Sequence, residues 1–244
     1  MAPDKKRKRD DAEKTTIKST RKSKRSRPAG SLHTNGSAPD AAKVTAPETI
    51  VAPLEVMVSD TKSSKIGKYL ALDCEMVGTN APPIGPREHS TLARISITNY
   101  HGHVIYDSYV APPTGHKITD YRTWVSGIEP HHLYQAPTFE HVQDHVKSLL
   151  KGRVLVGHAL VNDFRALQFT HPKHMVRDTS TFPKFKDYSV GRTPGLKKVA
   201  LMELGINIQG AQHSSIEDAR ACMAIYRKYK AEFEQRATQK ALGN

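Results

Sequence analysis

Y-L-A-L-D-C-E-M-V-G, at positions 69–78, leads four mostly apolar residues into two carboxylates, Asp73 and Glu75, with one residue between them. In an extended strand, side chains two positions apart point to the same face. Asp73 and Glu75 would therefore project together, roughly 7 Å apart, while Cys74 would point into the packing on the other side. Neighbouring carboxylates favour a hard cation such as Mg²⁺ or Mn²⁺. On this stretch alone, an acidic strand end without a ligand is an equally good explanation.

The rest of the composition bounds the class of protein. The chain has 244 residues, enough for one full domain with an appendage or for two small domains. Its two cysteines are too few for a disulfide framework and indicate a reducing compartment. No apolar run approaches the ~18 residues that span a bilayer, and no apolar segment follows the basic start, so we expect neither a membrane span nor a secretory signal.

The positive charge is concentrated at the N-terminus. Of the formal net charge of +13, residues 1–30 contribute +8, from twelve Lys/Arg and four Asp/Glu, which leaves +5 for the rest. A charge of this sign favours a polyanionic partner, with nucleic acid the first candidate. Two basic clusters, K-K-R-K-R at 5–9 and R-K-S-K-R at 21–25, are eleven residues apart and resemble a bipartite nuclear-import signal. We therefore expect an import receptor as a partner and the nucleus as the location; RNA binding is compatible with this, and a merely solvated tail is the alternative.

The aromatic residues divide the chain into regions. All sixteen Phe, Trp and Tyr lie beyond residue 66, and a segment without them buries too little apolar surface to offset its ordering entropy. We predict a disordered basic tail over 1–66, a folded domain over 67–235 and a short tail over 236–244. Within the domain the patterns predict strands at 69–77, 92–98, 104–110, 153–157 and 175–178, and helices at 138–150, 162–168, 196–204 and 214–233. A three-strand antiparallel meander followed by strands alternating with helices predicts an α/β fold with a mixed central sheet flanked by helices.

Two further stretches carry acidic residues. In V-L-V-G-H-A-L-V-N-D-F-R-A-L, at 154–167, a buried strand ends at His158 and a helix begins near Asp163. Capping and the helix dipole are sufficient to explain an aspartate at a helix start, and His158 has an equally good structural explanation.

The third stretch, H-S-S-I-E-D-A-R-A-C-M-A-I-Y at 213–226, begins the last predicted helix. Ser214 with Glu217 fits a capping box, and Ser215 with Asp218 is a second pairing of the same kind. His213 precedes the cap and is not required by the helix. With an ordinary pKa near ~6.5, it is suited to take a proton from a metal-bound water.

Together the three motifs resemble the DEDDh exonucleases, which have a ribonuclease H-like fold. D-x-E on the first strand, N-D-F at a helix start and H-x-x-x-x-D on the last helix occur in the family's order. L-D-C-E-M-V-G, L-A-R-I-S-I, I-T-D-Y-R-T-W-V-S-G-I, V-G-H-A-L-x-N-D and H-S-S-I-E-D-A-R-A are similar to the eukaryotic Rex branch of that family. The resemblance covers roughly residues 67–232.

The resemblance implies a metal-dependent 3′→5′ exonuclease that releases 5′-nucleotides. Asp73, Glu75 and Asp218 would bind one divalent ion, Mg²⁺ or Mn²⁺, and Asp73 would bridge to a second ion held by Asp163. His213 would be the general base. Because four clustered carboxylates repel one another, metal binding should stabilise the domain.

The resemblance also implies substrate contacts. Met76 and Arg122 match positions that face the terminal nucleotide; a core residue and a surface ion pair are the respective alternatives. Five basic residues are candidates for contact with the RNA backbone, although a solvated loop explains any one of them: Lys184, Lys186, Arg192, Lys197 and Lys198. Trp124 could stack on a base or pack in the fold.

By the same resemblance the enzyme would trim precursor ribosomal RNA in the nucleolus, acting on a single-stranded 3′ end. Two alternatives stay open. The basic tail also suits a ribosome-assembly factor whose RNA binding, not its turnover, is essential. The second alternative is a DNA repair exonuclease, because the chemistry of the site does not require a 2′-hydroxyl.

Overall fold

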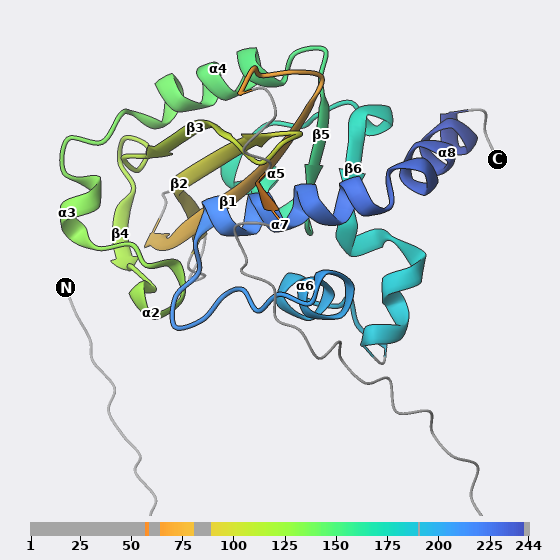
Figure 1. Ribbon diagram of the computed structural model, residues 1–244. Helices are drawn as coiled ribbons and strands as arrows, with labels where there is room; N and C mark the ends of the chain where they lie inside the picture. Colours follow the sequence, from red (N-terminus) through yellow and green to blue (C-terminus); the bar gives the residue numbers. More distant parts are fainter. Residues whose placement is uncertain (1–56, 59–63, 81–88, 190, 242–244) are drawn as a thin grey trace, which may run out of the picture. The chain divides into compact units, whose positions relative to one another are not determined.

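The computed structural model describes residues 57–58, 64–80, 89–189 and 191–241 (Figure 1). The strands are β1 (Tyr69–Asn80), β2 (His89–Asn99), β3 (Val104–Tyr109), β4 (Lys117–Asp120), β5 (Val154–Gly157) and β6 (Val176–Asp178). The α-helices are α2 (Thr123–Ser126), α3 (Pro130–Leu133), α4 (Phe139–Leu150), α5 (Val161–Leu167), α6 (Leu196–Leu204), α7 (Ser215–Lys228) and α8 (Lys230–Ala241). Three 3₁₀ segments join β6 to its neighbours: η1 (Lys173–Met175), η2 (Thr179–Thr181) and η3 (Pro183–Tyr188).

One mixed sheet organises these elements. Its strand order is β3-β2-β1-β5-β6, with β4 pairing against the end of β1. β1 runs antiparallel to β2, and β2 to β3, whereas β1–β5 and β5–β6 are parallel pairs. The predicted meander followed by parallel strands is therefore confirmed. The prediction missed β4, because its four residues, K-I-T-D, give no alternation long enough to read.

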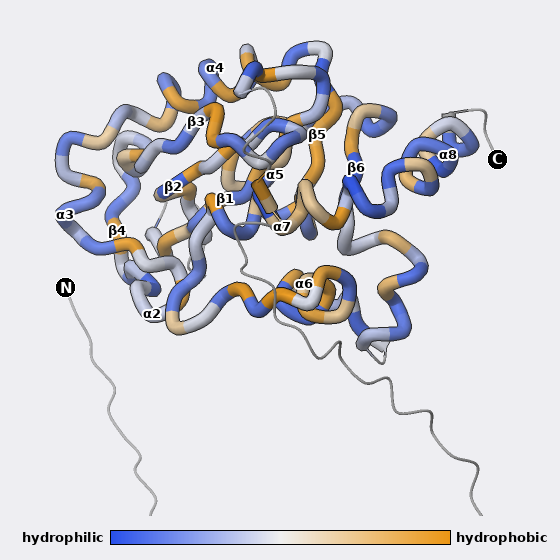
Figure 2. The backbone as a smooth tube through the Cα atoms, in the orientation of Figure 1, coloured by the Kyte–Doolittle hydropathy of each residue, from blue (hydrophilic) through white to orange (hydrophobic). Residues whose placement is uncertain are grey.

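Alternation along β1 divides the core between the two faces of the sheet. Leu70 and Leu72 join one apolar cluster with residues of α4 and α5, while Ala71 joins another with residues of α6 and α7. Figure 1 shows α7 crossing the strands on one side, with α5 behind them. Figure 2 shows that β5 is hydrophobic and α8 largely hydrophilic, as expected for a buried strand and a surface helix.

The last helix differs most from its prediction. A single helix over 214–233 was predicted, but the chain forms α7 and α8 with a break at Tyr229, whose φ of −113° and ψ of 21° leave the helical region. The Tyr229 ring is buried and its hydroxyl donates to the buried carboxylate of Glu203. α8 then continues to Ala241, so residues 236–241, predicted as part of a tail, are helical.

The N-terminal edge of the domain also lies earlier than predicted. Met57 is buried among residues of α7 and α8, and its carbonyl accepts a hydrogen bond from Arg227 at 3.2 Å. A Cβ on Gly102, whose φ is +86°, would lie 2.2 Å from that carbonyl oxygen, so glycine is required there. Residues 1–56 and 59–63 of the predicted tail, which include both basic clusters, lie outside the described residues.

Two simpler findings complete the fold. Cys74 and Cys222 are both free thiols and both buried. Within the described residues, no helix combines the length and the apolar character that crossing a membrane requires.

Candidate active site

Three elements bring four acidic side chains toward one another. Asp73 and Glu75 lie on β1, Asp163 lies in the first turn of α5, and Asp218 lies in the first turn of α7. Glu75, Asp163 and Asp218 are at most 5% exposed, and Asp73 is partly buried. Because α5 follows β5, which is parallel to β1, Asp163 reaches the same end of the sheet. The sequence placed these four acids in one site, and the structure brings them together.

The proximity of these acids is reflected in their proton affinities. Burial, and then repulsion by Asp163 and Asp218, raises the pKa of Asp73 well above its ordinary value. Burial, and then repulsion by Asp218, raises the pKa of Glu75 to about 8. The pKa values of Asp163 and Asp218 are raised to about 7, in both cases chiefly by burial. Such a cluster is electrostatically costly unless a cation or protons compensate it.

Asp163 does not cap its helix. Leu160 occupies the N-cap position of α5 without a side-chain hydrogen bond, and the free amides of Ala159 and Leu160 donate instead to Asp178 at 2.9 and 3.0 Å. Asp163 is therefore not the N-cap residue, but the helix-dipole part of the predicted explanation stands, because Asp163 lies in the first turn of α5. Asp178, at the end of β6, is the residue whose carboxylate accepts the backbone amides at the start of α5.

Cys74 lies closer to the site than predicted. It faces the α4 and α5 side of the sheet, as alternation requires, and on that side it contacts Asp163 of α5. The thiol and the backbone amide of Cys74 both donate to Asp163, which lowers the pKa of Asp163 against the larger effect of burial. Burial, followed by repulsion from Asp163 and Asp73, raises the pKa of the Cys74 thiol. The thiol thus stays protonated and acts as a donor, not as a nucleophile.

Gln209 holds Asp218 and was not predicted. Its side-chain amide donates to Asp218 Oδ2 at 2.8 Å, and its backbone amide donates to Glu217 Oε2 at 3.1 Å. The predicted capping box of Ser214 and Glu217 is therefore wrong: Ser214 is the N-cap of α7 but makes no side-chain hydrogen bond. Gln209 lies in an irregular loop with a φ of +55°, so no periodic pattern could have identified it.

His213 stands at the open side of the cluster. Its backbone amide donates to the Val125 carbonyl at 2.7 Å, which fixes the loop before α7 against α2. Its ring Nδ1 lies 4.0 Å from Asp218 Oδ2, and the side chain is 38% exposed. Partial burial, followed by the charge of Lys197, lowers the pKa of His213. The imidazole is therefore neutral at pH 7 and able to accept a proton.

A chain of hydrogen bonds supports Glu75. The Ser215 backbone amide donates to Glu75, and the Ser215 hydroxyl lies 2.7 Å from that of Ser96. Ser96 in turn donates to Asp107 at 2.7 Å, and Asp107 pairs with the guanidinium of Arg94 through bonds of 3.0 and 2.9 Å. Arg94 also lowers the pKa of Glu75 by attraction, against burial and Asp218. The first turn of α7 is thus tied to β2 and β3.

The donor set fits a divalent cation. All four candidate ligands supply carboxylate oxygens, which Mg²⁺ and Mn²⁺ prefer, and two buried oxygens, Glu75 Oε1 and Asp218 Oδ1, have no hydrogen-bond partner. Their spacing is not that of a closed coordination shell: among the described residues, no three or more His, Cys, Asp or Glu side chains form a group that could hold a metal ion as they stand. Mutual repulsion of the carboxylates accounts for this wider spacing.

The two predicted substrate contacts differ in their surroundings. Met76 follows an irregularity in the β1–β2 register after Glu75 and packs, partly buried, against the apolar cluster on the α4 side. Arg122 has a φ of +52°; its backbone amide donates to Asp120 at 2.8 Å and its guanidinium to the Ser90 hydroxyl at 2.9 Å.

Hydrogen bonds anchor some of the remaining candidate side chains. Lys184 donates to the Tyr229 hydroxyl at 2.9 Å and Lys197 to the Gln209 carbonyl at 2.8 Å. His158 bonds Thr179 and the Pro194 carbonyl, both at 2.9 Å, which bears out its structural explanation. Trp124, by contrast, is 77% exposed and does not pack in the core. All five basic candidates are exposed, including the hydrogen-bonded ones: Lys184, Lys186, Arg192, Lys197 and Lys198.

The four acids come from one strand and two helices and gather at one end of a mixed sheet with the strand order β3-β2-β1-β5-β6. This arrangement is that of a nuclease domain. The exonuclease (RNase_T) family model matches residues 70–226. The chain belongs to this exonuclease family, whose members generally use divalent metal ions. The ribonuclease H-like fold expected from the motifs is thereby confirmed.

Curated relatives carry the name RNA exonuclease 4. The Saccharomyces cerevisiae protein is 48% identical over 195 residues, which cover 77% of this chain and 65% of that protein. The Mycosarcoma maydis protein is 50% identical over 182 residues, covering 72% and 47%. The resemblance to the Rex branch is confirmed, including H-P-K-H-M-V-R-D-T at 171–179, which favours RNA exonuclease 4 within it. The chain spans about half to two thirds of the length of these relatives.

Solved structures of the Saccharomyces cerevisiae Pan2 pseudoubiquitin hydrolase–RNA exonuclease module share the fold. In complex with AAUUAA RNA, that module is 29% identical with a TM-score of 0.57, over 77% of this chain and 32% of the other. In complex with A7 RNA it is 31% identical, also with a TM-score of 0.57, over 75% and 32%.

Proposed function

We propose that the chain is a metal-dependent 3′→5′ exoribonuclease that hydrolyses phosphodiester bonds and releases 5′-nucleotides. One observation carries this proposal: four carboxylates from β1, α5 and α7 converge beside a histidine whose pKa is lowered. Buried acids that raise one another's pKa in this way are the expected apparatus for divalent cations. The names of the relatives, and the RNA bound to the neighbouring Pan2 modules, support RNA as the substrate.

Each acidic residue receives a role in this proposal. Asp73, Glu75 and Asp218 would hold one ion, and Asp73 with Asp163 would hold the other. When bound, two such cations stabilise the attacking and the leaving oxygen of an in-line displacement at phosphorus. Gln209 and Cys74 keep Asp218 and Asp163 in place by donating to them.

His213 supplies the proton transfer. Its neutral ring, at the open side of the cluster, would take the proton of the attacking water as that water approaches the phosphorus. The bond between phosphorus and the 3′ oxygen of the preceding nucleotide would break. That oxygen takes up a proton and remains on the shortened chain as a 3′-hydroxyl, and the released nucleotide keeps the phosphate on its 5′ oxygen. Met76 and Arg122 would contact the terminal nucleotide.

An RNA labelled at its 5′ end, incubated with Mg²⁺ or Mn²⁺, tests the reaction. We expect a ladder of labelled fragments that shorten from the 3′ end. Internal cleavage, or no cleavage by protein that binds the metal, contradicts the proposal. A DNA oligonucleotide of the same sequence measures the preference for RNA, because the acids and His213 do not themselves read a 2′-hydroxyl.

For the cell, we propose a nuclear and nucleolar enzyme that trims precursor ribosomal RNA after delivery by an import receptor. The basic clusters at 5–9 and 21–25 and the relatives named RNA exonuclease 4 support this. Asp73→Asn distinguishes it from an assembly factor whose turnover is dispensable. Defective rRNA maturation at a normal protein level supports the enzyme; normal maturation favours the binding role.

A further inference from the structure

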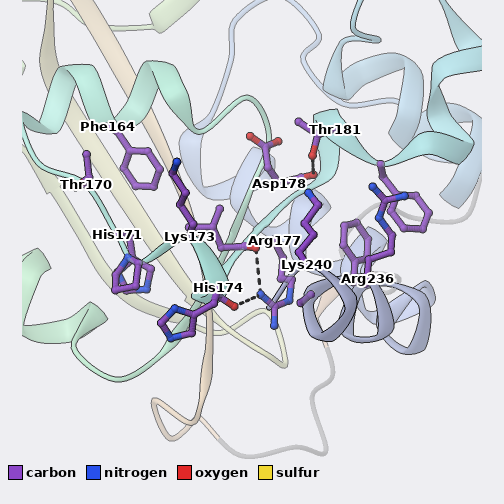
Figure 3. Close-up of a pocket in the computed structure, with 15 residues that line it drawn as sticks. Phe164, Thr170, His171, Lys173, His174, Arg177, Asp178, Thr181, Arg236 and Lys240 are labelled. Atoms are coloured by element: carbon purple, nitrogen blue, oxygen red, sulfur yellow. Dashed lines mark hydrogen bonds between the residues drawn. The ribbon is translucent and has the colours of Figure 1, made fainter. Parts of the chain in front are cut away.

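A large pocket among the described residues lies apart from the acidic site. It has a volume of about 1010 Å³ and lies at β6, the edge strand of the sheet, between η1, α5 and α8 (Figure 3). None of the four clustered acids lines it. One end is formed by Asp178 and Thr181, at the strand ends where the acids gather, and the other by η1.

The lining of this pocket is strongly basic. Four Lys and Arg side chains face one acidic residue, Asp178, and two histidines, His171 and His174, add to them. The Asp178 carboxylate, which accepts the amides of Ala159, Leu160 and Ser180, supplies one negative charge against these four positive ones. Arg177 is neutralised by Glu234 through two bonds of 2.8 Å. In the described part of the chain, no ion pair involves the other cations: Lys173, Arg236 and Lys240.

These cations lie on two sides of an aromatic lining. Figure 3 shows Lys173 and His174 from η1 on one side and Arg236 and Lys240 from α8 on the other. Phe164, which is partly buried, offers ring surface to the pocket, whereas the Phe182 ring is 3% exposed and stacks on Phe233, with the Arg236 guanidinium 5.7 Å from its centre. Cations combined with aromatic faces are the usual means of holding single-stranded nucleic acid without reading its sequence.

The pocket is adjacent to the acidic site along α5. Asp163 and Phe164 are consecutive residues, and a helical step of about 100° turns the first toward the acids and the second toward the pocket. Asp178 lines the pocket, yet its charge raises the pKa of Asp163. A strand whose 3′ end entered the acidic site could therefore continue into the pocket.

We propose that this pocket binds the phosphate backbone of the RNA upstream of the scissile end, an inference that rests on the proposed function. An acidic protein segment is the competing occupant. RNA is favoured because the pocket adjoins a site that itself requires a polyanionic chain, and because aromatic rings accompany the cations. The pocket holds the body of the substrate, and the acidic site holds its last nucleotide.

The test compares two double variants of the full chain. Lys173→Gln/Lys240→Gln removes two exposed charges from the pocket, and Lys68→Gln/Lys147→Gln removes two exposed charges before β1 and on α4. Binding of a fluorescent single-stranded RNA is measured by anisotropy in EDTA, so that no turnover is needed. We expect weaker binding for the pocket variant alone. Its log–log salt slope should fall by about 1.4, at about 0.7 for each phosphate contact of a single strand.

Further measurements decide between the outcomes. With Mg²⁺, the pocket variant should hydrolyse a dinucleotide with unchanged kcat and KM, because a dinucleotide does not reach the pocket. Equal RNA affinity and salt slope in the two variants overturn the inference, as does stronger loss of polyglutamate binding than of RNA binding. If the unmodified protein does not hydrolyse RNA, the proposed function is contradicted. The binding assay in EDTA needs no hydrolysis, so it still tests whether the pocket binds RNA.

Discussion

The hydroxyls of Ser96 and Ser215 lie 2.7 Å apart in the protein interior and join β2 to the first residue of α7. Each hydroxyl has one proton. Because Ser96 donates its proton to Asp107, Ser215 must donate to Ser96. One short contact thus holds the helix that carries Asp218 against the strand beside Glu75.

Loss of that contact should loosen the acidic site. Ser215→Ala removes a buried donor, and we expect a loss of about 1 kcal/mol in the free energy of unfolding, measured by urea denaturation. Ser148→Ala, which removes an exposed hydroxyl on α4, is the control. An equal effect of the two substitutions would show that the Ser96–Ser215 contact contributes nothing special.

Replacing one of the acids should abolish turnover without abolishing RNA binding. Loss of an outer-shell partner commonly reduces metal affinity or activity 10–100-fold, so we expect Asp218→Asn to lose at least about 100-fold in activity. The measurement is the initial rate on labelled RNA at saturating Mg²⁺, with circular dichroism to confirm folding. A folded Asp218→Asn protein with near-normal activity would falsify the assignment of Asp218 as a ligand.

The Gln209 amide should matter for metal affinity more than for the maximal rate. Gln209→Leu leaves Asp218 Oδ2 without its donor, and we expect about 10–100-fold weaker metal binding. Titration of activity with Mg²⁺ should show a higher half-saturating concentration and a recoverable plateau. Gln212→Leu changes an exposed residue of the same loop and should behave like the unmodified protein.

The pH dependence of the rate should report on His213. A general base must be unprotonated, and the pKa of His213 is lowered, so the rate at saturating Mg²⁺ should rise with pH to a plateau whose midpoint lies below 6.5. His213→Ala should lose about 10²- to 10⁴-fold and no longer show that midpoint. His141→Ala, on the exposed face of α4, is the matched control; persistence of the same acid limb in His213→Ala would assign it to another group.

Stability without metal should fall as the pH rises. The folded pKa values of Asp163 and Asp218 are about 7 and that of Glu75 is about 8, whereas in the unfolded chain all three lie near ~4. Between pH ~4 and pH ~8 the folded state therefore binds more protons than the unfolded state. The free energy of unfolding is highest below pH ~4 and falls as the pH rises through the folded pKa values of about 7 and 8. For Asp218 alone the displacement from 3.8 corresponds to at most about 4 kcal/mol.

Melting temperatures in EDTA and in Mg²⁺ measure this effect. In EDTA the melting temperature should be lower near pH ~8.5 than near pH ~6. Mg²⁺ should raise it, and raise it more at the higher pH, where the carboxylates are charged. A melting temperature that Mg²⁺ leaves unchanged at both values would contradict the proposed metal site.

The sequence predicted the residues of the site better than their contacts. Alternation on β1 and the helix starts placed the acids in the secondary structure, because these signals depend on backbone periodicity; that the four acids form one site followed only from the resemblance to the exonuclease family. Gln209 was missed because a loop residue with a positive φ has no period, and its role depends on tertiary contact. The break at Tyr229 was missed because a long-range bond to Glu203 overrides local helix propensity.

Arg177 determines how the sheet ends at β6. An edge strand presents unpaired carbonyl groups to which another chain could add a strand. The Arg177 guanidinium donates to the carbonyls of His174 and Val176 at 2.7 and 3.1 Å, and Glu234 of α8 holds it in place. Acceptors that an incoming strand would need are thus already occupied. We therefore expect the Arg177–Glu234 ion pair to oppose the addition of another strand beside β6.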